Sequence, residues 1–233
     1  MLGKLESDIQ QEAVLERFVN RKGTEMIYIV KYTGPFGFIK PWTAVRDSET
    51  YSQNFLTPSI IEGIEKKLFP ELLEQEKYEP RIVRHRLTYI GLSKQQEQTQ
   101  PRGISVTVKK KESIAVIDRP RSILIRGVLL NPILYIALSK LEFAERAIQQ
   151  HICLCRNEDV LLPAEFLTSE YILKINKEEF DEPDNGFNGF ELRFGKTKQS
   201  FIVGFNRFDK SKPMYGWLHI VGNNPLTSQV SSR

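Results

Sequence analysis

Apolar residues recur at helical spacing most clearly in residues 57–72. Thr57 is a good N-cap residue, and Pro58 suits the first position of a helix. Gly63 interrupts the apolar stripe, which we interpret as a close approach by another backbone. The pattern predicts a helix that begins at Thr57 and packs the stripe on a sheet. The stripe consists of Ile60, Ile61, Ile64, Leu68 and Leu72.

β-branched and aromatic residues dominate most other apolar segments and predict strands. In the strand at residues 81–92, alternation places Arg84 and Arg86 on one face together with Ile82. The Gln-rich residues 93–102 are predicted to form a polar loop. The other predicted strands cover residues 26–32, 104–108, 114–117, 122–130, 132–143 and 215–221, with more in the Phe-rich region 187–208.

Helical spacing returns at residues 1–22 and 144–152, where two further helices are predicted. The order strand, helix, strands, strand and helix predicts an α+β fold built on an antiparallel sheet, with additional strands near the C-terminus. We divide the chain into an N-terminal extension at 1–25, one domain at 26–222 and a disordered tail at 223–233.

Composition places the chain among ordinary globular proteins. Of its 233 residues, 40% are hydrophobic and 27% are charged, and the formal net charge is +4. No apolar run reaches the roughly 18 residues that span a bilayer, and the N-terminus has no signal pattern, so we expect a cytoplasmic protein without a membrane partner. Cys153 and Cys155 are predicted to be reduced core thiols, since their spacing suits neither a disulfide nor a zinc site. The three histidines share no ligand spacing, so neither metal nor cofactor is expected.

Positive charge is concentrated between Arg81 and Arg126. This segment holds 11 Lys or Arg residues against three Asp or Glu residues. Such an excess is typical of a surface that contacts a phosphate backbone, and an ordinary solvated surface is the alternative.

Basic and aromatic residues also precede the predicted helix at Thr57. Cations contact phosphates, rings stack on unpaired bases, and the first amides of a helix favour an anion, so single-stranded nucleic acid is the leading partner. For Arg84 or Arg86 a packed, paired position is the alternative. The candidate RNA-binding residues are Lys40, Trp42, Arg46, Tyr51, Thr57, Ser59, Arg84, Arg86, Arg102, Lys109, Lys110, Arg119, Arg121 and Arg126.

Several segments resemble one known family. Thr57-Pro-Ser-Ile-Ile-Glu-Gly-Ile64 is similar to a helix start of the Cas-five family of CRISPR-associated RAMP proteins, nearest the type I-C branch. Residues 81–92, Arg126–Leu138, Glu145–Cys155 and Leu162–Phe166 resemble later segments of that family in the same order. The resemblance covers about residues 26 to 208. It implies a ferredoxin-like, RRM-like core.

The resemblance also implies a function. Such a chain would grip the 5′ handle of a guide CRISPR RNA within a Cascade-like antiviral ribonucleoprotein complex in a prokaryote and nucleate its assembly. Its partners would be the CRISPR RNA, a repeated backbone subunit, a large subunit and, through the complex, target DNA.

The alternative is a metal-independent endoribonuclease of the same fold that processes precursor CRISPR RNA. Tyr51 and His85, with Lys40 or Arg84, are the residue types that such acid–base chemistry needs. Some family members cleave RNA with a tyrosine and a Lys-His pair, and no such pair lies beside residues 129–132. A binding role is therefore favoured over catalysis. A third class, a phage or structural protein unrelated to RNA, leaves the basic segment unexplained.

Overall fold

A computed structural model describes residues 25–41, 48–74, 79–98, 105–109, 114–118, 122–206 and 212–222. Residues 105–109 and 114–118 are described as strands, without their side chains. The helix predicted at 1–22 and the tail predicted at 223–233 lie outside these ranges.

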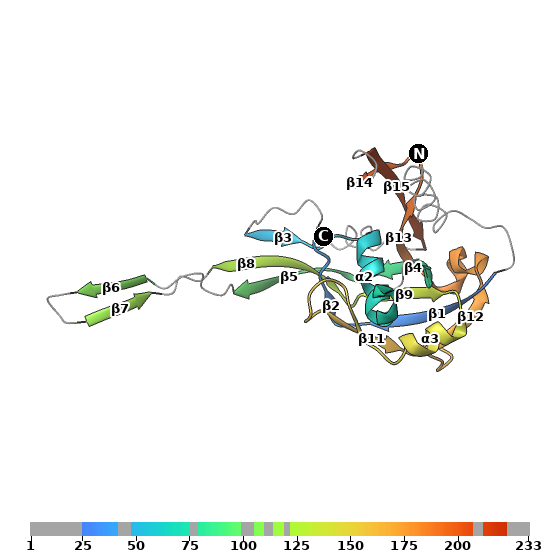
Figure 1. Ribbon diagram of the computed structural model, residues 1–233, viewed down its shortest axis with the longest axis horizontal. Coiled ribbons are helices and arrows are strands. Elements are labelled where there is room, and N and C mark those ends of the chain that lie inside the picture. Colours follow the sequence, from blue (N-terminus) through green and yellow to red (C-terminus); the bar gives the residue numbers. More distant parts are fainter. Residues whose placement is uncertain are drawn as a thin grey trace, which may run out of the picture.

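One large antiparallel sheet forms the body of the protein (Figure 1). Its strands follow the order β10-β11-β1-β9-β4-β13-β15-β14, and β12 pairs with β1 beside β11. The bounds of these strands are β1 Met26–Thr33, β4 Ile82–Thr88, β9 Ile133–Leu138, β10 Ile152–Cys153, β11 Val160–Ala164, β12 Ile172–Asn176, β13 Gly189–Phe194, β14 Phe201–Asn206 and β15 Lys212–Val221.

Two helices, α2 (Pro58–Leu68) and α3 (Leu141–Ala147), connect strands of this sheet. Along the chain the elements run β1, α2, β4, β9, α3 and then β11 and β12. In space the four strand positions run β11/β12, β1, β9, β4, all antiparallel. The described chain is thus an α+β protein, as the sequence pattern predicted.

Alternating side chains of the central strands point into two hydrophobic cores, one on each face of the sheet. On the first face, both helices pack on the sheet and bury residues such as Tyr32, Leu68 and Ile136. On the second face, Ile29 and Tyr135 pack under Phe180, which belongs to the short helical turn η2 (Glu178–Asp181). A second turn, η3 (Pro183–Asn185), follows it, and a third, η1 (Pro70–Leu73), follows α2.

A second sheet leaves the body as a long arm between β4 and β9 (Figure 1). Its two long strands, β5 (Gly91–Gln98) and β8 (Ile123–Leu130), pair antiparallel over their full length. Two short strands, β2 (Phe36–Gly37) and β3 (Glu49–Tyr51), pair with β8 at the base of the arm, and β3 does so in parallel. Further out, β6 (Ser105–Lys109) and β7 (Ile114–Asp118) pair with each other.

The helix predicted from Thr57 is confirmed as α2, but it ends at Leu68, so Leu72 of the predicted stripe lies in the turn η1, and Ile60 is half-buried. Ile61, Ile64 and Leu68 are at most 4% exposed. The interpretation of Gly63 is wrong, because a Cβ built there meets no atom within 4 Å. This glycine accommodates no neighbouring backbone.

Four further sequence predictions need correction. Residues 93–98 belong to strand β5, not to a loop, because their backbones pair with β8 while their polar side chains give no apolar alternation. The predicted strand at 132–143 ends at Leu138, so α3 begins earlier than expected. Both cysteines are free as expected, but Cys155 is exposed and so is not a core residue.

The fourth correction concerns the two faces of β4. A bulge between Ile82 and Arg84 shifts the alternation by one residue. Ile82 therefore packs in the helix-covered core, whereas Arg84 and Arg86 project to the opposite face, over the Phe180 ring.

Candidate nucleic-acid interface

The base of the arm presents an aromatic ring on an open strand. Tyr51 on β3 is 42% exposed and lies directly across from Gly127 on β8. A Cβ built at Gly127 would lie 2.1 Å from a carbon of the Tyr51 ring. Gly127 therefore gives the ring a flat seat, and one side of the ring rests on the sheet.

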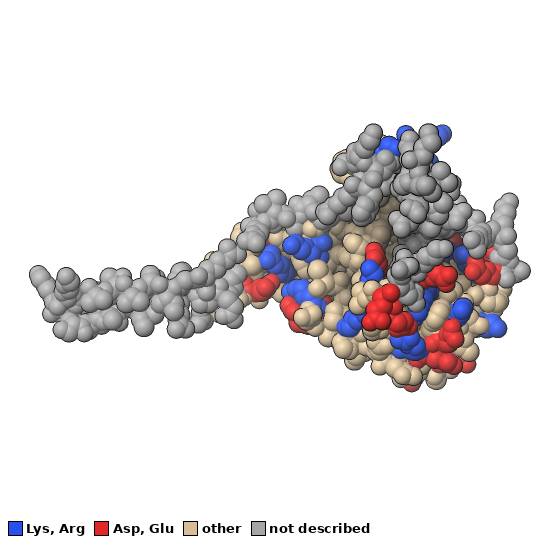
Figure 2. Space-filling view, in the orientation of Figure 1, with Lys and Arg blue, Asp and Glu red and all other residues tan. Residues whose placement is uncertain are grey.

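A lysine completes this surface. Lys94 on β5 lies opposite Gly127 on the other side of β8, and its Nζ is 5.8 Å from the centre of the Tyr51 ring. Lys94 Nζ and the Tyr51 hydroxyl both donate to Glu49, at 2.7 and 2.9 Å. The hydrogen bond to Glu49 raises the pKa of Lys94 to about 12, and the bonds from Lys94 and Tyr51 lower the pKa of Glu49. Figure 2 shows lysine and arginine side chains gathered where the arm leaves the body, with acidic ones beside them.

A second lysine, Lys40, lies close to this surface. Ser52, which follows Tyr51, donates its backbone amide to Gly127 at 2.7 Å, and its hydroxyl accepts from the amide of Ile39 at 2.9 Å. Lys40, which follows Ile39, is exposed. The fold thus brings Lys40 close to the segment that carries Tyr51.

Thr57 and Ser59 lie a few residues further on, at the first turn of α2. Thr57 is the backbone N-cap, but its hydroxyl lies 3.0 Å from that of Ser59 and makes no capping bond. Thr57 is 8% exposed and Ser59 is exposed, so only Ser59 offers its side chain to a ligand at the surface.

The opposite face of the arm carries Arg126. Its Nε donates to Glu97 at 3.3 Å, and Arg156 Nη1 lies 4.0 Å from the same carboxylate. The side chain of Arg126 is 18% exposed. This arginine therefore lies on the other side of β8 from the Tyr51 ring.

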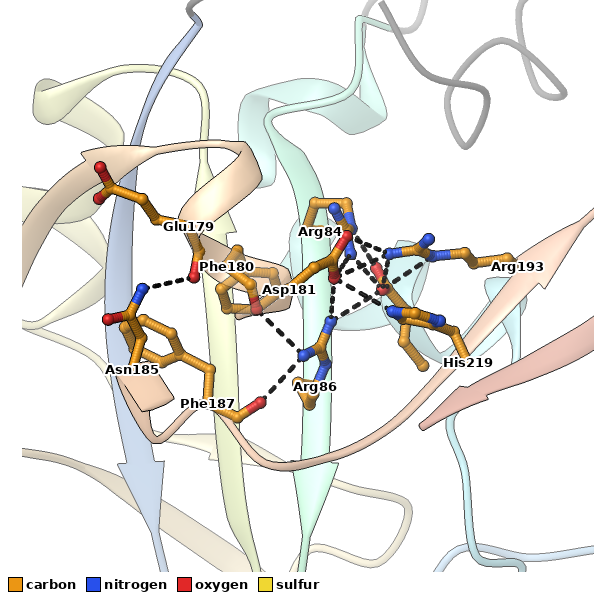
Figure 3. Close-up of polar contacts among 10 residues, drawn as sticks. Arg84, Arg86, Glu179, Phe180, Asp181, Asn185, Phe187, Arg193 and His219 are labelled. Carbon is orange, nitrogen blue, oxygen red and sulfur yellow. Dashed lines mark hydrogen bonds and ion pairs between the residues drawn. The ribbon is translucent and has the colours of Figure 1, made fainter. Parts of the chain in front are cut away.

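Arg84 and Arg86 are packed and ion-paired, which was the alternative to an RNA contact for these two residues (Figure 3). Both are buried, at 8% and 0% exposure. Arg84 donates two hydrogen bonds of 2.6 Å to the fully buried Glu191 and one of 2.7 Å to Asp181. Arg86 donates to Asp181 at 2.7 Å and to the carbonyl of Phe180 at 3.0 Å. In the folded chain these two arginines hold η2 against the sheet and do not face a surface ligand.

Two residues of the C-terminal strands complete this network, which we call the arginine network (Arg84, Arg86, Asp181, Glu191, Arg193 and His219). Arg193 donates to Asp181 at 2.9 Å and to Glu191 at 3.2 Å, and His219 Nε2 lies 3.2 Å from Asp181. Three guanidinium groups face two carboxylates, so the network carries a net charge of +1 with His219 neutral.

The network shifts the acidity of its carboxylates. Burial alone would raise the pKa of Glu191, but the hydrogen bonds and charges of Arg84 outweigh it and lower that pKa to about 2. The pKa of Asp181 is lowered in the same way by His219 and Arg84, against the effect of burial. Sequence reasoning missed Asp181, Glu191 and Arg193, although a lone Glu191 among phenylalanines was a signal of a buried ion pair.

The two candidate catalytic residues are not brought together. Tyr51 lies on the arm sheet, whereas His85 lies on β4 of the main sheet, opposite Ile136, and is 2% exposed. An acid–base pair made of these two side chains is not present in the described structure.

The remaining candidates lie outside what the structure describes. This holds for Trp42, Arg46, Arg102, Lys110, Arg119 and Arg121. Lys109 ends β6, but its side chain is not described. Within the described ranges, no helix is long and apolar enough to cross a membrane, and no group of His, Cys, Asp or Glu could hold a metal ion.

Comparison with known proteins leaves the family open. No protein-family model and no curated protein matches the sequence. Among solved structures, a chain of a "CRISPR RNA-guided surveillance complex" matches with 9% identity and a TM-score of 0.43, covering 88% of this chain and all of the other. At this identity and TM-score, the likeness does not decide the function.

Proposed function

We propose that the chain is a guide-RNA-binding subunit of a CRISPR ribonucleoprotein complex and that it grips the unpaired 5′ handle of the RNA at the base of its arm. One observation carries the proposal: an exposed tyrosine ring seated on Gly127, next to Lys94, where a long two-stranded arm leaves the body. A seated ring can stack on an unpaired base, and the lysine beside it can contact the phosphate.

The ring has the geometry that stacking requires. One of its sides rests on the sheet, and the side chain as a whole is 42% exposed. The edge position of β3 leaves room for a strand of RNA to approach, because β3 pairs only with β8 among the described strands. Base–aromatic stacking contributes about 1 to 3 kcal/mol per base, enough for one ring to matter to affinity.

Glu49 competes with phosphate for Lys94. Its carboxylate neutralises Lys94 in the free chain, so an incoming phosphate has to compete for that lysine. An exposed ion pair of this kind contributes little to stability, so exchange of the partner is feasible. Lys40 is exposed nearby without a described ion pair and supplies a further cation.

The order of the core elements supports the family assignment that the sequence resemblance suggests. The chain order β-α-β-β-α-β, with the fourth strand next to the first and the third next to the second, supports a ferredoxin-like core. We propose this core, with the arm inserted between its second and third strands, as the RNA-binding scaffold. The repeated backbone subunit and the large subunit are proposed partners of the same complex.

Arg84 and Arg86 are left out of the proposed RNA site because the arginine network engages them. A nuclease role receives no support from the described residues, since Tyr51 and His85 lie in different sheets.

Purification of the tagged chain from its host, followed by sequencing of bound RNA, tests the proposal. We expect RNA with a common 5′ segment derived from CRISPR repeats, and a several-fold lower yield with Tyr51→Ala combined with Lys94→Ala. Glu62→Gln, which alters an exposed pair on α2 and changes neither Tyr51 nor Lys94, is the control that keeps the wild-type yield. RNA without a common 5′ segment, or an unchanged yield in the double variant, would reject the proposed site.

A further inference from the structure

The three C-terminal strands carry a second surface, distinct from the arm, that the proposed function does not use. We call it the C-terminal face and define it by Arg193, Ile202, Phe205, Tyr215, Trp217 and His219. In an antiparallel pair, directly opposed residues project to the same side. Arg193 lies opposite Trp217, Ile202 lies opposite Tyr215, and Tyr215, Trp217 and His219 alternate along β15. Phe205 joins them through its pairing with Pro213.

Aromatic and apolar side chains on this face are open to solvent. Phe205 is 59% exposed and Ile202 is 48% exposed, while Tyr215 and Trp217 are half-buried. The Trp217 ring rests against Gly195, where a built Cβ would lie 3.1 Å from it. Successive rings of β15 are about 7 Å apart along the strand, which leaves room for a base beside each. An open row of seated rings is typical of a binding surface.

The charge of the three C-terminal strands indicates what kind of partner the C-terminal face binds. In residues 189–206 and 212–222, Glu191 is the only acidic residue, and the arginine network engages it. The cations of the same ranges are Arg193, Lys196, Lys198 and Lys212. The three lysines are exposed, and Lys196 Nζ lies 5.2 Å from the centre of the Tyr215 ring. Where β14 and β15 end at the top of the view, the charged side chains in Figure 2 are blue.

The arginine network adds to this positive field from below. With His219 counted as neutral, its net charge is +1, and two of its residues, Arg193 and His219, reach the C-terminal face with side chains 17% and 28% exposed. Both are held in place by Asp181. The positive charge of Arg193 at this edge of the face is therefore fixed in place before any ligand arrives.

We propose that the C-terminal face binds a single-stranded nucleic acid, with bases stacked on Tyr215 and Trp217 and phosphates contacted by the exposed Lys196. Rings alternating with cations, with no exposed carboxylate in residues 189–206 and 212–222, match a strand whose bases are unpaired and whose backbone is negative. An apolar protein partner would gain from the rings but would leave these cations without counter-charges. The inference is independent of the guide-RNA proposal, because it concerns another sheet region and other residues.

Tryptophan fluorescence tests the proposal directly. The chain has two tryptophans, so Trp42→Phe leaves Trp217 as the only one. The full-length variant is titrated with an oligouridine and an oligodeoxythymidine of about 12 nucleotides, a length within the range of small single-strand sites. We expect quenching of Trp217 by at least one of them, and the stronger ligand tells whether RNA or DNA is preferred. An abasic oligomer of the same length should quench several-fold less, because it cannot stack.

Substitutions then separate this face from the arm. Tyr215→Ala and Lys196→Glu should each weaken the quenching titration by about fivefold or more, whereas Tyr215→Phe should keep it. Ile220→Ala, an exposed residue of the same strand on the opposite face, is the matched control and should leave it unchanged. Tyr51→Ala on the arm should leave it unchanged as well.

The proposal is overturned if neither oligomer quenches Trp217. It is also overturned if Lys196→Glu and Tyr215→Ala titrate like the parent, or if Ile220→Ala loses as much as they do. Because Tyr215→Phe and Lys196→Glu alter no buried group, the test stands even if Tyr215→Ala unfolds. If the wild-type chain shows Trp217 quenching but binds no handle RNA, the guide-RNA proposal alone is rejected.

Discussion

Replacing Glu191 by Gln tests the arginine network as a determinant of stability. Glu191 is fully buried and accepts hydrogen bonds from Arg84 at 2.6 Å twice and from Arg193 at 3.2 Å. Glutamine keeps the size of the side chain but removes its charge. The net charge of the network would rise from +1 to +2, with Asp181 as the only remaining carboxylate.

The size of the effect follows from the burial. Removing one partner of a buried ion pair costs about 3 to 5 kcal/mol, because the other charges stay buried without compensation. A protein of this length loses about 2 to 4 °C in melting temperature per kcal/mol. We therefore expect the melting temperature to fall by about 6 to 20 °C.

Thermal unfolding followed by circular dichroism measures this shift, and urea unfolding gives the free energy independently. Glu62→Gln is the control, because Glu62 pairs with Lys66 on the exposed side of α2 and such a pair contributes only about 0.3 to 0.5 kcal/mol. A Glu191→Gln variant that melts within about 1 °C of the control would refute the reasoning.

Three further outcomes follow from the same structure. Leu68→Ala on α2 should cost about 2 to 5 kcal/mol in urea unfolding, since Leu68 is 0% exposed, and a loss below about 1 kcal/mol would contradict its core position. Gly63→Ala should stabilise the protein by up to about 1 kcal/mol, because an added Cβ meets nothing, and a lower melting temperature would contradict this. The pKa of Glu191 is about 2 in the folded chain, against an ordinary value of 4.5, so its contribution is complete above pH 4.5 and is lost as the pH falls toward 2. A Glu191→Gln variant should therefore differ less from the parent at pH 3 than at pH 7, and an equal difference at both would oppose this.

The sequence predicted the elements whose apolar residues follow a clear period. The apolar stripe of α2 predicted a helix packed on a sheet, and the apolar, β-branched and aromatic residues of β1 and β9 predicted strands; all three elements contribute to the helix-covered core. Most of strand β5 was not predicted, because neither of its sides is deeply buried. Its polar residues, mainly Gln, therefore show no apolar alternation. Pairing with β8 alone makes it a strand.

The positions of Arg84 and Arg86 could not be read from alternation. A single bulge in β4 moves Ile82 to the other face and places both arginines under η2, which is nearly 100 residues away in the chain. Sequence alone does not reveal a bulge or a partner as distant as Asp181. Tyr51 was identified from its neighbours, but its seat on Gly127 depends on the parallel pairing of β3 with β8, which no local pattern indicates.

We propose that the base of the arm grips the unpaired 5′ end of a guide RNA. Fluorescence anisotropy of the labelled RNA that co-purifies with the chain, titrated at several salt concentrations, tests it most directly. If the arm grips the RNA in this way, log K falls linearly with log salt, with a slope of about −0.7 for each phosphate neutralised, and an RNA with a scrambled 5′ segment binds several-fold more weakly. Equal affinity for the scrambled RNA, or an affinity that does not change with salt, would contradict it.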